Sequence, residues 1–66
     1  MIKYGDTGEQ VKDLQIRLQQ FGLDTGSTDG VFGPLTLAAW TRFEQEHLVD
    51  YKVVTDEEFE RLQELT

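Results

Sequence analysis

The strongest constraint on this chain is a motif near its middle, Asp29-Gly30-Val31-Phe32-Gly33-Pro34-Leu35-Thr36. Gly30 and Gly33 can adopt positive φ angles that other residues avoid, so the chain is predicted to turn tightly twice. Pro34 lacks an N–H and has a fixed φ, which suits the first position of a helix and makes Gly33 the predicted N-cap. Phe32 lies between the two turns and is expected in the core. The motif therefore predicts a rigid corner that directs the helix after it.

A first helix is predicted before the corner, over about residues 8–21. Thr7 and Gln10 have the spacing of a capping box, with Thr7 as the N-cap. Gly22 is predicted to end the helix as a left-handed C′ residue. Ile16 lies off the apolar side, where we expect an ordinary exposed residue; the alternative is a contact residue. The apolar stripe of this helix has spacings of three and four residues and consists of Val11, Leu14, Leu18 and Phe21.

A second helix is predicted from Pro34 to about His47, after a loop over residues 23–29. Trp40 is expected to contribute more to the core than any other residue, and the alternative is a platform that stacks on sugar. His47 would end the helix, where the helix dipole favours a cation. The predicted buried side of this helix carries Thr36, Ala39, Trp40, Phe43 and His47.

A third helix is predicted over residues 56–65, after an irregular or weakly extended segment over residues 48–54. Thr55 and Glu58 form a second capping-box pattern, and acidic residues fill the first turn as the helix dipole prefers. Phe59, Leu62 and Leu65 give this helix its apolar side. Together the three segments predict a single all-α domain over residues 1–66, a compact three-helix bundle. Its core is expected from several leucines and from Phe21, Phe32, Trp40, Phe43 and Phe59.

Charge and composition exclude several classes of function. Six basic and thirteen acidic residues give a net charge of −7, which argues against binding to nucleic acid or to an anionic membrane surface. The simplest role for this charge is solubility. The chain has no cysteine and one histidine, and neither a metal site nor any cofactor is expected. No apolar run has the length of a membrane span or of a secretory signal. The chain is thus expected to be either a module of a longer protein or a protein made without a leader.

The motifs resemble those of the peptidoglycan-binding domain type 1 family, whose members are small three-helix modules attached to bacterial and phage cell-wall hydrolases. The resemblance covers about residues 4–48. It rests on Gly5, Gly8, Val11, Leu14, Gln15, Leu18 and Gly22, and on Asp29, Gly30, Phe32, Gly33, Pro34, Thr36, Ala39 and Phe43. The last third departs from the family, which often repeats a glycine-proline block before its third helix. Lys52, Thr55, Asp56 and Glu58 stand in that block here.

The resemblance implies a non-catalytic module that holds the glycan or the stem peptide of peptidoglycan in a shallow groove beside the corner. The predicted ligand-binding residues are Asp29, Gly30, Phe32, Thr36, Gln15, Arg42 and Tyr51, and Tyr4 is a further candidate for stacking on sugar. Gln15 and Arg42 are interpreted as exposed polar side chains on the helices that flank the corner. Two of these interpretations have alternatives: an Asx turn for Asp29, and a surface ion pair with Glu46 for Arg42.

A second hypothesis is a protein-interaction module that reuses the same bundle, such as a phage structural, capsid-decorating or assembly protein. Met1 directly before the domain favours it, and the intact corner motif favours wall binding. Its predicted contact residues are Ile16, Leu37 and Leu48. The expected location is the cell wall in the first case and the virion in the second. No enzyme is expected, because the carboxylates are scattered over helix surfaces and His47 has no serine or cysteine at triad spacing.

Overall fold

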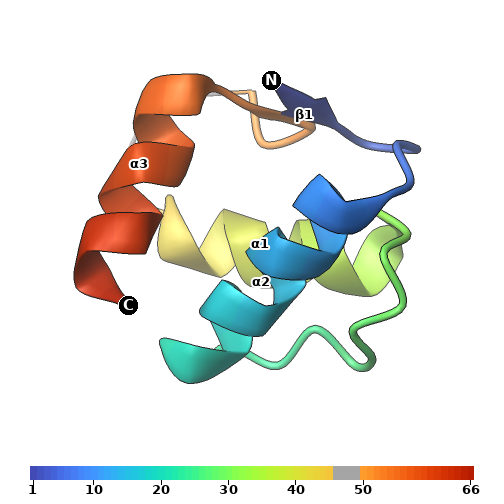
Figure 1. Cartoon of the computed structure of the whole chain (residues 1–66), viewed down its shortest axis with the longest axis horizontal. Coiled ribbons are helices and arrows are strands. Elements are labelled where there is room, and N and C mark those ends of the chain that lie inside the picture. The colour runs from blue at the N-terminus through green and yellow to red at the C-terminus, as the bar shows by residue number, and fades with distance from the viewer. Residues whose placement is uncertain (46–49) are drawn as a thin grey trace.

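The computed structural model describes residues 1–45 and 50–66, which form three helices and two very short strands (Figure 1). The elements follow the order β1 (Ile2–Lys3), α1 (Glu9–Gln20), α2 (Pro34–Phe43), β2 (Val53–Val54) and α3 (Asp56–Leu65). α1 packs against both α2 and α3. The predicted all-α three-helix bundle is confirmed.

One apolar core joins the three helices. Trp40 and Leu14 are fully buried and Phe32 is 1% exposed, so the corner and both flanking helices meet there. The burial of Trp40 confirms its predicted place in the core and removes it as a sugar-stacking surface. The core consists of Ile2, Val11, Leu14, Leu18, Phe32, Ala39, Trp40, Val54 and Leu62.

The two strands pair antiparallel and join the N-terminus to the segment before α3. Ile2 lies opposite Val54, and both side chains are buried. The Tyr4 N–H donates to the Lys52 carbonyl at 2.8 Å and extends this pairing by one bond. The weakly extended segment predicted over residues 48–54 thus becomes a strand at its end, while its first two residues lie outside the described part.

α1 ends as predicted but begins differently. Gly22 has a φ of 100°, and two bonds, from the Leu23 N–H to Leu18 and from the Gly22 N–H to Gln19, close a Schellman motif. At the other end, the predicted capping box on Thr7 is wrong. Gly8 is the N-cap, with no side-chain cap bond, because Thr7 is drawn into a β-bridge with Val31.

α2 begins at Pro34 with Gly33 as its N-cap, as predicted. Gly33 has a φ of −109°, so the prediction of a left-handed angle there is wrong, while Gly30 has the predicted positive φ of 77°. The helix ends at Phe43 with Glu44 as the C-cap, earlier than predicted. His47, the predicted last residue, lies outside the described residues, as do Glu46 and Leu48.

α3 has the predicted bounds, and its capping box is confirmed. The Glu58 N–H donates to Thr55 Oγ1 at 3.2 Å, and the Thr55 N–H donates to Glu58 Oε1 at 2.9 Å. These reciprocal bonds satisfy two backbone donors at the helix start.

Two residues beside the end of α2 have environments that the sequence did not predict. Phe21, predicted in the core, is 45% exposed and packs edge-on against Phe43, with ring centroids 5.1 Å apart. Glu44 is buried and forms an ion pair with Arg61, whose guanidinium also lies over the Phe43 ring. This ion pair links the end of α2 to α3. Glu44 lies four residues after the buried Trp40, on the same side of the helix.

Candidate functional site

The corner is built from two chain segments that lie antiparallel, residues 5–8 and 30–32. Gly8 donates its N–H to the Gly30 carbonyl at 2.9 Å, and Phe32 donates its N–H to the Asp6 carbonyl at 2.9 Å. A Cβ on Gly30 would lie 3.0 Å from the Gly8 carbonyl oxygen. Glycine is therefore required at this position both by its positive φ and by the close approach of the two segments.

Gln15 is the polar residue that fixes the corner to α1. Its side-chain Oε1 accepts from the Gly30 N–H at 2.9 Å. Its Nε2 lies within hydrogen-bond distance of three acceptors: Thr36 Oγ1 at 2.9 Å, the Val31 carbonyl at 3.0 Å and Asp29 Oδ1 at 3.1 Å. Gln15 is 1% exposed, so its interpretation as an exposed polar residue is wrong. Its buried amide instead fixes the positions of the corner and of Thr36 through these hydrogen bonds.

Asp29 forms an Asx turn, which confirms the alternative interpretation of this residue. Its Oδ1 accepts from the Val31 N–H at 2.9 Å and from Gln15. These bonds, the first from the Val31 N–H and the second from Gln15, lower the pKa of Asp29 below its ordinary value. The exposed carboxylate is therefore negatively charged at neutral pH.

A pocket of about 230 Å³ opens between the corner and the start of α2. Its floor includes the buried hydroxyl of Thr36, and its rim includes two exposed apolar side chains, Val31 (46%) and Leu35 (62%). Thr25 is also buried and accepts from Gln19 Nε2 at 2.9 Å, which fixes the far wall. The lining consists of Gln15, Thr25, Ser27, Asp29, Val31, Gly33, Pro34, Leu35 and Thr36.

The backbone at the start of α2 adds donors to this pocket. The first turn has no side-chain cap, and its first backbone bond runs from the Leu37 N–H to Gly33. The Leu35 and Thr36 N–H groups therefore have no intrahelical acceptor.

Comparison with known families decides the class of the chain. Residues 7–48 match the model of the peptidoglycan binding domain family. The chain belongs to this family. The match covers α1, the motif over residues 29–36, α2 and every residue that lines the pocket, while α3 and both strands lie outside it. No solved structure matches the chain.

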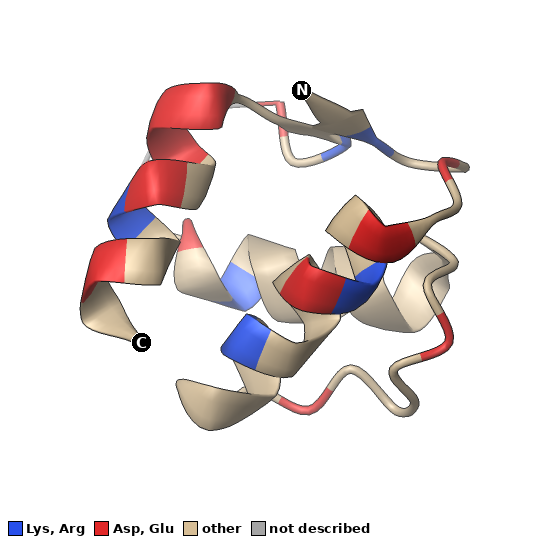
Figure 2. Cartoon of the chain, in the orientation of Figure 1, with Lys and Arg blue, Asp and Glu red and all other residues tan. Residues whose placement is uncertain are grey.

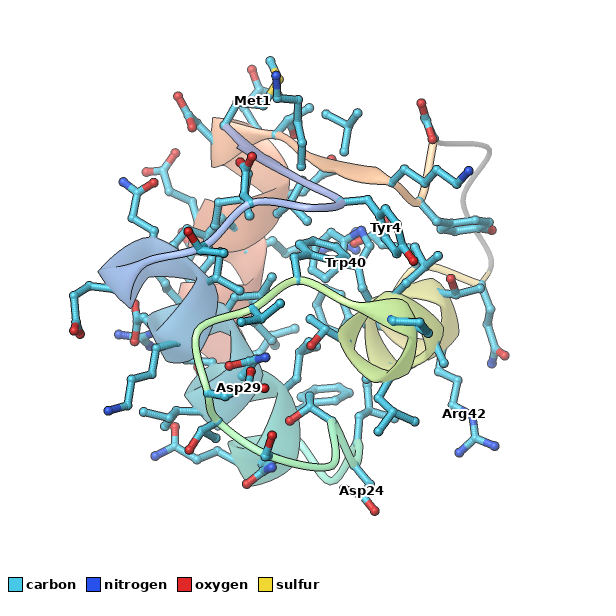
Figure 3. All side chains as sticks on the ribbon, turned by 90° about the vertical axis from the view of Figure 1, so that its right-hand side faces the viewer. Met1, Tyr4, Asp24, Asp29, Trp40 and Arg42 are labelled. Carbon is cyan, nitrogen blue, oxygen red and sulfur yellow. The ribbon has the colours of Figure 1, made fainter. Side chains whose placement is uncertain are left out.

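The structure groups only some of the predicted ligand-binding residues of this peptidoglycan-binding module. Asp29, Thr36 and Gln15 line one pocket, and Gly30 and Phe32 lie directly behind it as buried parts of the corner. Arg42 is exposed and points away from Asp29, on the other side of α2 (Figure 3).

Tyr51 belongs to a second, wider depression of about 530 Å³, lined by Leu37, Thr41, Asp50, Tyr51 and Lys52. Tyr4 is 42% exposed and lies near it, with Lys52 Nζ 5.8 Å from the Tyr4 ring centroid. Tyr4 also packs edge-on against Phe32 at 6.0 Å.

Six residues that line the pocket were not among the predicted ligand-binding residues: Thr25, Ser27, Val31, Gly33, Pro34 and Leu35. Thr25 and Ser27 lie in a loop whose residue types predict turns. Nothing in this composition indicates that the loop lines a pocket. The burial of Gln15 did have a signal: it lies four residues after Val11 and three before Leu18, on the apolar side of α1.

The described residues contain neither a metal-binding cluster nor a membrane-spanning helix. No cluster of three or more His, Asp or Glu side chains in residues 1–45 and 50–66 has the arrangement of a metal site. Within the same residues, no helix has the length and apolar character needed to span a bilayer.

Proposed function

We propose that residues 1–66 act as one non-catalytic module that anchors a larger protein, such as a cell-wall hydrolase, to peptidoglycan. One observation carries this proposal: the pocket beside the corner lies wholly within the segment that matches the peptidoglycan binding domain family. The module would accordingly act at the cell wall.

The pocket offers the two kinds of hydrogen-bonding group that a glycan or a peptide requires. The Asp29 carboxylate accepts from hydroxyl and amide donors, and the Leu35 and Thr36 N–H groups donate to carbonyl oxygens. Exposed Val31 and Leu35 add apolar contact area on the rim. We further propose that Tyr51, in the second depression, contacts a more distant part of a long polymer.

A direct test is co-sedimentation of the purified chain with insoluble peptidoglycan, with serum albumin as the control protein. We expect the chain to be retained and albumin to stay in solution. Retention no greater than that of albumin would contradict the proposal.

A second candidate is a protein-interaction module of a phage particle. It is favoured by exposed apolar side chains away from the pocket: Ile16 is 39% exposed, Phe21 45% and Leu65 56%. In the same assay it predicts that the chain does not sediment with peptidoglycan. Leu37, another predicted contact residue, is half-buried against the core and offers less surface.

A further inference from the structure

We infer that the pocket beside the corner binds the acetamido group of an N-acetylated amino sugar. This inference rests on the proposed function and specifies which part of peptidoglycan the pocket selects. Pockets for drug-sized ligands measure roughly 300–1,000 Å³. At about 230 Å³, this pocket is suited to one substituent of a polymer and not to a whole disaccharide.

The first group that selects an acetamide is the Thr36 hydroxyl. Thr36 is 2% exposed and lines the pocket, and its Oγ1 accepts from Gln15 Nε2 at 2.9 Å. Among the described residues, the bond from Gln15 is accepted by this hydroxyl, and no hydrogen bond is donated by it. A hydroxyl both donates and accepts, so this hydrogen remains for a ligand carbonyl oxygen.

The second group is the Asp29 carboxylate on the rim. Its bonds from the Val31 N–H and from Gln15 Nε2 both end on Oδ1, and a hydrogen bond from the Ser27 side chain also helps to lower its pKa. Because the carboxylate is charged, its oxygens accept from an N–H and repel a ligand carboxylate. The pocket is therefore poorly suited to a stem-peptide carboxylate and well suited to an amide.

The third feature is apolar surface next to these two polar groups. Pro34, Leu35 and Val31 line the same pocket, and the side chains of Leu35 and Val31 are largely unburied. An acetamido group presents a carbonyl oxygen, an N–H and a methyl group within one small plane. These three parts match the Thr36 hydroxyl, the Asp29 carboxylate and the apolar rim, whereas a sugar hydroxyl has no part that fits the apolar rim.

The test compares two neutral oligosaccharides that differ at the substituent in question. The β-linked tetramer of N-acetylglucosamine carries acetamido groups where cellotetraose carries hydroxyls. Each is titrated into the full chain while amide nitrogen–proton correlation spectra are recorded. We expect the N-acetylated tetramer to shift the Val31, Gly33 and Leu35 resonances and to bind roughly tenfold more tightly than cellotetraose, the effect of one or two added hydrogen bonds.

Two variants refine the assignment. Thr36→Val removes the hydroxyl hydrogen and should abolish the preference for the N-acetylated tetramer, whereas Thr36→Ser keeps the hydroxyl and should retain it. Thermal unfolding reports whether each variant is folded, and if Thr36→Val does not fold, the comparison of the two tetramers decides alone.

The outcomes separate this inference from the proposed function. Equal shifts with both tetramers, or shifts only outside the pocket, overturn the acetamido assignment. If neither tetramer binds while intact peptidoglycan retains the chain, the acetamido assignment falls and the wall-binding proposal stands. If peptidoglycan does not retain the chain either, both fall.

Discussion

Gln15 links three parts of the chain that are distant in sequence: α1, the corner and the first turn of α2. Two of its four hydrogen bonds are buried and two are partly buried. A buried group that loses its partner costs about 1–3 kcal/mol. The stability of a chain of this size is roughly 3–10 kcal/mol in total. One side chain is therefore responsible for a large share of it.

The variant Gln15→Leu should lower the free energy of unfolding by about 2–3 kcal/mol, because the Gly30 N–H loses its acceptor in the core. Gln20→Leu, at an exposed position of the same helix, is the matched control and should change it by less than about 0.5 kcal/mol. Denaturant unfolding measures both values. Equal values for the two variants would mean that the Gln15 contacts do not support the fold.

The two glycines of the corner should respond differently to the same substitution. Gly30→Ser should cost about 1–2 kcal/mol or more, because φ is 77° and a Cβ would crowd the Gly8 carbonyl. Gly33→Ser should be neutral or slightly stabilising, because Gly33 is extended, has space for a Cβ and is an N-cap. Thermal unfolding measures the stability of both variants. A larger loss of stability in Gly33→Ser than in Gly30→Ser would contradict the structure.

The carboxyl group of Asp29 should make the free energy of unfolding depend on pH. Its pKa is lower in the folded chain than its ordinary value, so its contribution is complete above that value and is lost as pH falls through the folded pKa. Asp29→Asn keeps an acceptor oxygen but has no charge. The stability gap between the two proteins should therefore shrink between about pH 5 and pH 2. A gap that stays constant in unfolding measurements across this range would refute the assignment.

At the scale of elements, only one of the two predicted capping boxes forms, because the threonine before α1 pairs with another segment of the chain. Thr55 caps α3, while Thr7 pairs with Val31 and leaves α1 without a side-chain cap. Thr55→Ala should therefore destabilise the fold by about 1 kcal/mol, and Thr7→Ala by less than about 0.5 kcal/mol. Denaturant midpoints measure both, and the reverse order would contradict the observed caps.

The elements also indicate what the sequence could reveal. The spacing of Val11, Leu14 and Leu18 and the glycine at position 22 were enough to predict α1 and its end. The failure at Thr7 has a physical cause: a capping pattern is local, and the bridge to Val31 joins residues far apart in the chain. The same holds for Glu44, which is buried and forms an ion pair with Arg61 on another helix, far along the chain.

The site was predictable in part for similar reasons. The corner motif predicted that Asp29 and Thr36 lie close together, and both line one pocket, because glycine and proline constrain the backbone wherever they occur. The pocket itself depends on the loop that contains Thr25 and Ser27 folding back beside α2, and no residue pattern specifies that path. Arg42 was assigned to the corner from its helix, but its side chain lies on the other side of that helix (Figure 3).

In the whole molecule, the most acidic helix lies away from the pocket. Five of the thirteen acidic residues are in α3, which lies across the molecule from the loop that lines the pocket (Figure 2). The net charge of −7 is thus compatible with a pocket that contains a single carboxylate, that of Asp29.

The most direct test of this account compares two exposed leucines, Leu35 on the rim of the pocket (62% exposed) and Leu65 on α3 (56% exposed). The measurement is the Kd of soluble peptidoglycan fragments for Leu35→Ala and Leu65→Ala, after unfolding curves have shown that both variants fold. We expect Leu35→Ala to weaken binding roughly tenfold through lost apolar contact and Leu65→Ala to leave the Kd unchanged. Equal effects, or an effect of Leu65→Ala alone, would contradict it.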